Sequence, residues 1–450
     1  MKGKSVSHRL QPADLPGKFP RSILFVAALL LLCSASSLLA QSDTNHYVVD
    51  SDAISEQSAR SYLFGEWGGE RTTLASRGVT FDFFYVADLL ANPVGGNQQA
   101  NTGWGRIRGT IDIDFGRLTE WNGLTFHATG LWQFGDNLGA KIGTLANPSG
   151  LVSAHATRLD SWWFQQAFFH NRMFVKAGQF AGLDFYGNQE FGASYVIEPL
   201  DYALGNLFPT TFESFDPAAT PAFEIRFYPV SNFYVKSAVL AGNRNPYQQD
   251  GSGFNFQIRN TPVFVFETGY THNAEDFMGQ KSRFSRKSYP SIFKVGAAYN
   301  DGKFTDAAGH KSNGNYLIYT MGNQALYRAE AGSNRGLDAT VGFDWSPDNL
   351  NKENSQLTAG LRYNGPIPSR PQDAVAFGFV YTKIGNPFRT IGIPLGLPAL
   401  GSEKAIELNY AAQLTHYMLV QPVFQYYSEV GGNWRVPNAA VFGFRTKINF

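Results

Sequence analysis

The amino-acid sequence predicts an all-β protein, a transmembrane antiparallel β-barrel of about 16 strands with a short N-terminal periplasmic helix. Three observations predict this fold. Aromatic residues make up 15% of the 450 residues and charged residues only 16%, against roughly 25% charged residues in soluble domains. Mean hydropathy is slightly negative. The chain has no continuous apolar run of about 20 residues, so the sequence does not predict a helical membrane protein. Strand-like alternation fills most of the chain, as a barrel requires.

Residues 1–40 have the organisation of a secretory signal peptide. Basic residues precede the apolar run Ile23–Leu32, and small residues follow as far as Ala40, which is the order of regions in such signals. The single cysteine, Cys33, lies in this segment, and a lipoprotein signal would need a small residue where Leu32 stands. Cleavage removes five basic residues and one acidic residue, so the net charge falls from +1 to −3. We expect an exported, disulfide-free chain in the outer membrane of a Gram-negative cell.

Residues 41–78 are expected to form an N-terminal tether and a short helix. Residues 41–60 are polar and small, and a helical pattern then begins near Glu66 and ends at Gly78. Glycine commonly terminates a helix. The barrel domain is therefore predicted to occupy residues 79–450.

The clearest strand pattern is Arg106–Phe115 (RIRGTIDIDF), which alternates strictly between apolar and polar residues. Successive side chains of a strand point to opposite faces, so one face of this strand is apolar and the other polar. Residues 124–133 and 337–345 repeat the pattern. A soluble β-sandwich alternates in the same way, so a single strand leaves sandwich and barrel both open.

The number and spacing of the strands favour the barrel. Sixteen candidate strands start near residues 80, 103, 121, 158, 172, 220, 232, 260, 291, 315, 336, 355, 373, 403, 416 and 439. Their connections mostly alternate between long (92–102, 134–157, 181–219) and short (116–120, 170–171). Bacterial outer-membrane barrels have an even strand number, long outer loops and short periplasmic turns, which places both chain ends in the periplasm. Residues 272–290, with the basic stretch 281–287, break the alternation and are interpreted as an insertion or a misplaced strand.

The C-terminus carries the most specific signal. Phe442, Phe444, Ile448 and the terminal Phe450 share one face of the last predicted strand. A final strand that ends on an aromatic residue resembles the signal that the barrel-assembly machinery recognises. We therefore expect Phe450 to act as the assembly signal.

Three segments resemble the carbohydrate-selective porins of the OprB family. Gly65–Tyr85 (GEWGGERTTLASRGVTFDFFY) is similar to the family's opening, Tyr363–Phe379 contains its Arg-Pro-x-Asp turn, and Glu403–Gly432 contains its Glu-x-Asn-Tyr, Gln-Leu-Thr, Gln-Pro and Gly-Gly pattern. The resemblance runs from about residue 62 to the end. It implies passive, carbohydrate-selective diffusion of mono- and disaccharides through a water-filled barrel.

The sequence departs from the family pattern at two places. His416 and Tyr417 stand where the family usually has Pro-Trp, and Val423 stands where an acidic residue is usual. The second departure removes one polar residue from the predicted wall, so the family's sugar preference is not carried over in detail.

Alternation selects the polar residues that would face the lumen. A sugar pore needs aligned donors and acceptors on its wall, which arginine and carboxylate side chains supply. The candidate pore-lining residues are Arg106, Arg108, Asp112, Asp114, Glu224, Arg226, Arg362, Glu407, Arg445 and Lys447. Arg106 and Arg108 are expected to act as a pair of donors to sugar near the constriction. The alternative for each residue is a charge that only solvates the wall or pairs with a neighbouring strand.

The segment 181–219 is the predicted constriction loop, because it is too long for a simple connection. Its candidate residues are Asp184, Tyr186, Glu190, Asp201 and Tyr202. A surface loop over the barrel mouth is the alternative. Trp104, Trp162 and Trp163 are interpreted as bilayer-interface residues in preference to sugar platforms.

The sequence gives little support for catalysis. The eight histidines show no HExxH spacing, and no GxSxG motif is present, so we expect no enzyme, no metal site and no cofactor. Two alternatives remain open: an outer-membrane barrel hydrolase and a non-conducting structural or adhesion barrel. The expected partners are small neutral sugars, outer-membrane lipid and the barrel-assembly machinery. A homo-oligomer is compatible with the sequence, and no nucleic-acid partner is expected.

Overall fold

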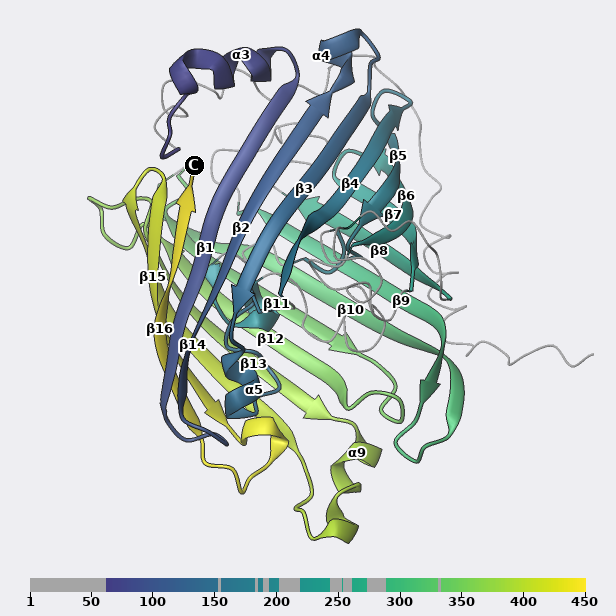
Figure 1. The fold of residues 1–450 in the computed structure, drawn as a ribbon, viewed down its shortest axis with the longest axis vertical. Helices are drawn as coiled ribbons and strands as arrows, with labels where there is room; N and C mark the ends of the chain where they lie inside the picture. The colour runs from purple at the N-terminus through teal and green to yellow at the C-terminus, as the bar shows by residue number, and fades with distance from the viewer. Residues whose placement is uncertain are drawn as a thin grey trace, which may run out of the picture. The chain divides into compact units, whose positions relative to one another are not determined.

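Sixteen strands form a closed antiparallel barrel (Figure 1). This computed structural model describes residues 62–152, 155–182, 185–188, 194–201, 219–242, 253, 261–272, 289–330 and 333–450. The strands are β1 (Val79–Val94), β2 (Ala100–Asp114), β3 (Leu124–Gly135), β4 (Ala156–Phe168), β5 (Met173–Phe180), β6 (Thr220–Val230), β7 (Phe233–Ala241), β8 (Pro262–His272), β9 (Ser291–Thr305), β10 (Lys311–Arg328), β11 (Gly336–Trp345), β12 (Glu353–Asn364), β13 (Ala374–Ile384), β14 (Ser402–Thr415), β15 (Met418–Ser428) and β16 (Ala439–Asn449). Each predicted strand starts within four residues of an observed one. The predicted fold class is confirmed.

Alternation separates the two faces of the barrel wall. On β6, Phe223, Ile225 and Phe227 are all more than 40% exposed, whereas Glu224 between them is 1% exposed. The apolar residues therefore form the outer, lipid-facing surface, and the polar residues point into the barrel. β1 pairs with β16, so no strand edge is left in the membrane, where unpaired backbone groups are costly.

The connections lie at two ends of the barrel. At one end, the terminal end, Leu63 N–H donates to Asn449 O, so the described N-terminal segment meets the last strand there. This end also carries the short turns at 169–172, 231–232 and 416–417, and α4 (Phe115–Thr119) between β2 and β3. The opposite end, the loop end, carries the connections 136–155, 181–219 and 385–401.

The structure bears on two of the predicted connections. The first loop was expected to be long, but β1 and β2 extend further than the sequence suggests and leave only residues 95–99 between them. Strands β8 and β9, on either side of the connection that begins after His272, pair directly with each other, so no strand of the sheet lies between them. Residues 281–287 of that segment lie outside the described residues.

The predicted N-terminal helix is present as η2 (Trp67–Gly69) followed by α3 (Glu70–Ser76). Gly68 and Gly69 have φ values of 72° and 98°, a region that suits glycine because it has no Cβ. The two glycines of the GEWGGER motif thus turn the chain into the helix. Among the described residues, no helix has the length and apolar character needed to cross a membrane.

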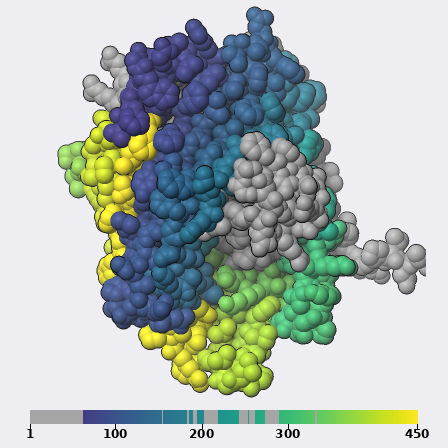
Figure 2. All heavy atoms as spheres, viewed as in Figure 1, coloured from purple at the N-terminus to yellow at the C-terminus, as the bar shows by residue number. Residues whose placement is uncertain are grey.

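The N-terminal segment holds the end of the chain. Arg71 Nη2 donates to the carbonyl of Phe450 at 2.9 Å, and its Nη1 donates to Phe81 O at 3.1 Å. The Phe450 ring packs between Phe64 and Phe83, with centroid distances of 5.5 and 5.2 Å. Figure 2 shows the N-terminal segment in purple against β16 in yellow. The first and last described parts of the chain therefore close the β1–β16 junction together.

The core lies inside the barrel and is formed by two connections that fold inward. Residues 138–152 include α5 (Leu138–Ile142), and residues 194–201 include α6 (Glu198–Asp201). Their buried side chains pack on interior residues of β13–β16, forming one cluster of Leu138, Ile142, Ala146, Tyr195, Val196, Ile197, Leu200, Ala376, Val380, Ala405, Val423, Tyr427 and Val441 among others. Val423, where the family pattern has an acidic residue, is part of this cluster. The interior on this side is therefore packed, and the two inserted segments narrow it.

Candidate functional site

Within its described residues, the connection 181–219 is held at two places on facing walls of the barrel. The first attachment comprises residues 185–188 and contacts β7, β8 and β9. The second attachment comprises residues 194–201 and contacts β12, β14, β15 and β16. Strands β8 and β16 are eight positions apart in the ring of sixteen, so they face each other. The connection is thereby fixed inside the barrel at both attachments.

Glu267 on β8 organises the first attachment. Its Oε2 accepts the N–H of Gly187 at 2.8 Å and the hydroxyl of Tyr319 at 2.7 Å, and its Oε1 accepts from Lys236 Nζ at 2.7 Å. Lys236 also donates to Phe185 O. Lys294 on β9 donates to Asn188 O at 3.2 Å. Wall side chains therefore satisfy the backbone groups of this segment, as buried polar groups require.

A lysine within an aromatic cage completes the first attachment. Lys176 Nζ lies 3.2 Å from the centroid of Phe185 and 4.9 Å from that of Trp163, and it faces Glu224 Oε1 at 3.5 Å. A cation over aromatic faces is stabilised electrostatically, more so when it is desolvated. Lys176 thus holds Phe185, and with it the first attachment, against β4 and β5.

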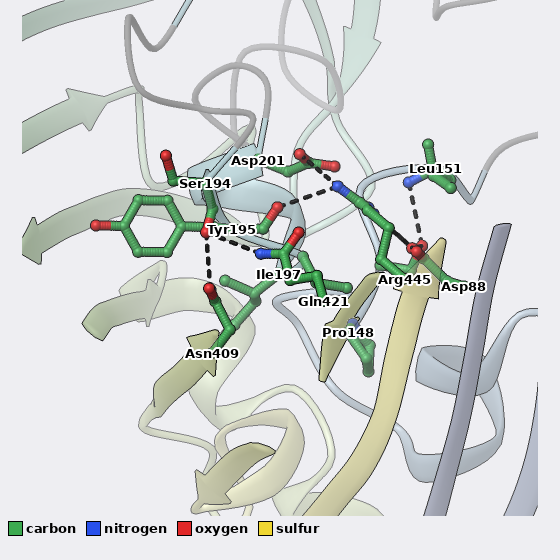
Figure 3. Close-up of polar contacts among 12 residues, drawn as sticks. Asp88, Pro148, Leu151, Ser194, Tyr195, Ile197, Asp201, Asn409, Gln421 and Arg445 are labelled. Atoms are coloured by element: carbon green, nitrogen blue, oxygen red, sulfur yellow. Dashed lines mark hydrogen bonds and ion pairs between the residues drawn. The ribbon is translucent and has the colours of Figure 1, made fainter. Parts of the chain in front are cut away.

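Glu407 on β14 organises the second attachment. Its two oxygens accept the N–H groups of Val196 and Ile197 at 2.9 and 2.7 Å. Asn409 and Gln421 donate to the Ser194 carbonyl at 2.8 and 3.0 Å (Figure 3). Side chains of the wall therefore both accept from backbone N–H groups of this segment and donate to one of its carbonyls.

Two interior glycines make room for the second attachment. A Cβ at Gly360 would lie 2.2 Å from the Tyr195 hydroxyl, and a Cβ at Gly378 would lie 2.6 Å from Leu200. The two glycines are direct neighbours on β12 and β13. Side chains there would displace the segment, so these glycines have a steric role.

Arg445 on β16 joins the second attachment to the barrel junction. Its guanidinium donates to Asp88 on β1 through two nitrogens, to Tyr195 O at 3.1 Å and to Asp201 Oδ1 at 2.8 Å (Figure 3). The planar fork of arginine suits such paired acceptors. Burial raises the pKa of Asp201, and Arg445 opposes this shift.

The segment 138–152 supports the second attachment from beside it. Gly150 N–H donates to Val196 O at 2.9 Å, and Glu198 N–H donates to Asn147 O at 3.0 Å. Glu403 accepts from the N–H groups of Leu145 and Ala146. The two inserted segments thus form one hydrogen-bonded unit on the β14–β16 side of the barrel.

Several predicted pore-lining residues are covered by the inserted segments. Glu407 and Arg445 hold the second attachment. Arg106 is 8% exposed and donates to Gln133 and to Leu151 O at 2.9 and 3.3 Å. Glu224 is 1% exposed between Lys176 and Arg226. These residues stabilise the interior. The pairing of Arg106 with Arg108 as sugar donors stays a prediction, and Arg108 is the more exposed of the two.

Other predicted residues keep part of their side chain open to the interior. Arg108 is 17% exposed and lies 3.5 Å from Asp160, Arg226 is 24% exposed, and Asp112 is 52% exposed with a 2.7 Å contact to His127. Arg362 on β12 lies opposite Asp338 in the register. Lys447 Nζ lies 5.0 Å from the ring of Phe84.

Asp114 is the last residue of β2 and also caps the helix that follows it. Its side chain accepts the N–H of Gly116 at 2.9 Å and so caps α4 at the terminal end. Aspartate is favoured at this position because its oxygen satisfies a free helical N–H. The predicted strand 106–115 extends one residue beyond β2, because Phe115 is the first residue of α4.

Two of the five predicted constriction residues belong to the attachments. Tyr186 is fully buried in the first attachment, and Asp201 is in the second. Asp184, Glu190 and Tyr202 lie outside the described residues.

Two of the three tryptophans considered as interface residues point inward. Trp104 packs with Val86 and Leu151, and Trp163 packs against the Phe185 ring in the first attachment. Trp162, next to Trp163 on β4, points to the opposite, outer face by alternation. The interface prediction is therefore wrong for Trp104 and Trp163, because both side chains lie on the interior face of their strands.

Sequence reasoning missed most of the residues that hold the inserted segments. The predicted set lacks Asp88, Lys176, Lys236, Glu267, Lys294, Gln421 and Gln425, the last of which donates to Pro148 O at 2.8 Å. The sequence feature that could have identified them is a single charged or amide residue among apolar residues on the interior face of a strand. Asp88 between Val86 and Leu90 is an example. The part of the chain that the structure describes contains no group of three or more His, Cys, Asp or Glu residues placed to bind a metal ion.

Known proteins resemble this chain over most of its length. A family model described as "Carbohydrate-selective porin, OprB family" matches residues 99–450. "Porin B" of Pseudomonas aeruginosa is 24% identical over 428 residues, covering 86% of this chain and 91% of that protein. "Putative porin QuiX" of Acinetobacter baylyi is 22% identical, covering 87% and 93%. The "High pH structure of Pseudomonas putida OprB" has a TM-score of 0.80 at 19% identity, covering 87% of this chain and 99% of that one.

Proposed function

The chain belongs to the carbohydrate-selective porins of the OprB family, and from this premise we propose that it admits neutral mono- and disaccharides past the connection 181–219. The family and the barrel fold make it an outer-membrane carbohydrate porin. They point to a channel and not to a barrel hydrolase. The finer proposal concerns which solutes pass and which residues they meet.

The observation that carries the proposal is the double attachment of the connection. Residues 185–188 are held by Glu267, Lys236 and Lys294, and residues 194–201 by Glu407 and Arg445 on the facing wall. A segment fixed at both sides narrows the path of a solute through the barrel. A surface loop over the mouth would have no reason to make these buried contacts.

The pairing of interior charges favours neutral solutes. Lys176 faces Glu224, Lys236 faces Glu267, Arg328 faces Asp338, and Arg445 faces Asp88. Opposite charges this close cancel much of each other's field at a distance, so the wall attracts free ions weakly. Hydroxyl groups can still bind the exposed parts of such pairs as donors and acceptors.

Arg108, Asp112 and Arg226 are the proposed sugar contacts. They keep 17%, 52% and 24% exposure inside the barrel. An arginine fork and a carboxylate together match the paired hydroxyls of a sugar ring. Binding at partly exposed groups is weak enough to let the solute leave, as conduction requires.

Reconstitution into planar bilayers tests the proposal. We expect stepwise conductance that neutral sugars block, and weaker block in Arg108→Ala and Arg226→Ala. Arg389→Ala is the matched control, because Arg389 is exposed on α9 (Asn386–Thr390) at the loop end. No conductance would refute the pore, and conductance unaffected by sugars would refute the selectivity.

Export and assembly complete the proposal. Residues 1–40 act as the signal peptide, residues 41–78 form the tether and helix, and residues 79–450 form the barrel. Phe450 is proposed as the signal read by the barrel-assembly machinery, and its outward position beside Phe83 supports this. The barrel can also form homo-oligomers, which cross-linking in native membranes would detect.

A further inference from the structure

An apolar groove of about 430 Å³ lies on the outer surface of β1–β4, close to the terminal end. Phe64 and Trp67 of the N-terminal segment lie at its rim, and Phe81 and Leu159 line its sides. These strands are in front in Figure 1, below α3. The groove is outside the barrel and separate from the solute path.

The floor of the groove is formed by two glycines on neighbouring strands. Phe83, Gly109, Gly130 and Leu159 are successive partners across β1, β2, β3 and β4. A Cβ at Gly130 would meet nothing closer than Arg158 O at 3.9 Å, and one at Gly109 would meet only Phe83, at 3.2 Å. The space above the glycines is therefore open, between two large apolar side chains.

The surroundings of the groove indicate what fills it. It is continuous with the lipid-facing surface, where Phe83 and Phe164 are more than 40% exposed. Its outward-facing lining is apolar, so it offers nothing to a headgroup and much to a hydrocarbon chain. At the rim, Trp67 is 43% exposed and Phe64 is 64% exposed, and aromatic side chains favour the membrane interface.

We propose that this groove binds one acyl chain of a phospholipid from the periplasmic leaflet. The terminal end is expected to face the periplasm, so the leaflet next to the groove consists of phospholipid. Binding depends on the chain and not on the headgroup. The N-terminal segment therefore has a second role: it forms one side of a lipid site in addition to covering the β1–β16 junction.

Native mass spectrometry of the full-length protein extracted from membranes tests this site. We expect one phospholipid to stay bound at detergent concentrations that remove the other lipids, whether it is phosphatidylethanolamine or phosphatidylglycerol. Gly130→Leu places a side chain in the groove at a position where the Cβ meets no atom closer than 3.9 Å. It should reduce the retained lipid about tenfold or more, because each displaced methylene loses about 0.8 kcal/mol of burial.

Gly322→Leu is the matched control. Gly322 is an outward-facing strand glycine on β10, and a Cβ there would meet only Phe293, at 3.2 Å. The Gly322→Leu variant should retain as much phospholipid as the unmodified chain does. If Gly130→Leu fails to assemble, Trp67→Ala, which removes one side of the rim, decides the question by the same measurement.

Three results would overturn the proposal. Equal lipid retention in the unmodified chain and in Gly130→Leu would show that the groove holds no chain. Retained lipid A would place the site in the wrong leaflet. Loss of an oligomer in Gly130→Leu with unchanged lipid would identify a second copy of the chain as the occupant.

Discussion

Arg445 and Asp88 form a two-point ion pair across the junction of the last and first strands, with Nε–Oδ1 at 2.7 Å and Nη2–Oδ2 at 2.8 Å. They are also direct partners in the β1–β16 register. Because Arg445 contacts Tyr195 O and Asp201 as well, one side chain links barrel closure to the position of the second attachment.

Replacing Arg445 should therefore affect stability and conductance together. Arg445→Ala leaves Asp88 buried without this partner, and breaking a buried ion pair costs about 3–5 kcal/mol. We expect a lower temperature for loss of the folded form on unheated gels, a larger conductance, and weaker sugar block because residues 194–201 are released.

Lys447→Ala is the control for Arg445→Ala. Lys447 lies two residues further along β16 and contacts the ring of Phe84, so its loss should change neither quantity by much. An Arg445→Ala barrel with normal conductance and block would mean that Glu407 and the wall amides hold the segment without Arg445.

Glu407→Gln tests the backbone contacts of the second attachment. The change keeps the side-chain volume but replaces one of the two oxygens that accept the Val196 and Ile197 N–H groups. An unsatisfied buried donor costs about 1–3 kcal/mol. We expect noisier, larger single-channel currents with the barrel still folded.

Glu429→Gln makes the same chemical change at a surface pair. Glu429 and Lys404 are both about 40% exposed, and such pairs contribute about 0–1 kcal/mol. Currents that change equally in both variants would contradict the assigned role of Glu407.

Phe450 and Arg71 can be separated experimentally. Deleting Phe450 should reduce the amount of barrel in the outer membrane far more than it alters pore properties. Arg71→Ala should leave that amount near normal but lower the unfolding temperature, because it removes the contacts to Phe81 O and Phe450 O. Normal membrane levels without Phe450 would refute its role as an assembly signal.

Trypsin treatment of intact cells tests the orientation of the barrel. Arg389 on α9 is exposed at the loop end, whereas Arg117 is on α4 at the terminal end. We expect cleavage after Arg389 in intact cells, and cleavage after Arg117 only once the outer membrane is permeabilised. The reverse order would place the terminal end outside the cell.

The second attachment should weaken as the pH rises. Burial and the nearby Glu353 raise the pKa of Glu198 in α6 from 4.5 to about 8. A carboxyl whose pKa is higher in the folded state contributes stability that is complete below its unfolded pKa and is lost as the pH rises through the folded value. We expect weaker sugar block at about pH 9 than at about pH 5, and Glu198→Gln should remove the difference. The same pH dependence in that variant would assign it to another group.

The strands could be predicted from sequence because the pattern that defines them is local. Arg106–Phe115 shows its two faces within ten residues, and no distant part of the chain is needed to assign them. An even number of such strands with alternating long and short connections then favours a closed outer-membrane barrel.

The roles of the interior charges could not be predicted in this way. Arg445 and Lys447 have the same type of charge and lie on the same face of β16, yet the first is buried under residues 195–201 and the second is not. The difference depends on where a connection more than 240 residues earlier in the chain folds. Alternation reports which face a side chain is on, but not what covers it.

The two attachments also have an evolutionary consequence. Among the residues that the structure describes, those that fix the connection 181–219 are on the strands and in two short stretches, 185–188 and 194–201. Mutations elsewhere in the connection can accumulate without loosening these contacts. Selection can thus change which solutes the pore admits through mutations in this connection, while the strand residues that hold it stay constrained by their contacts.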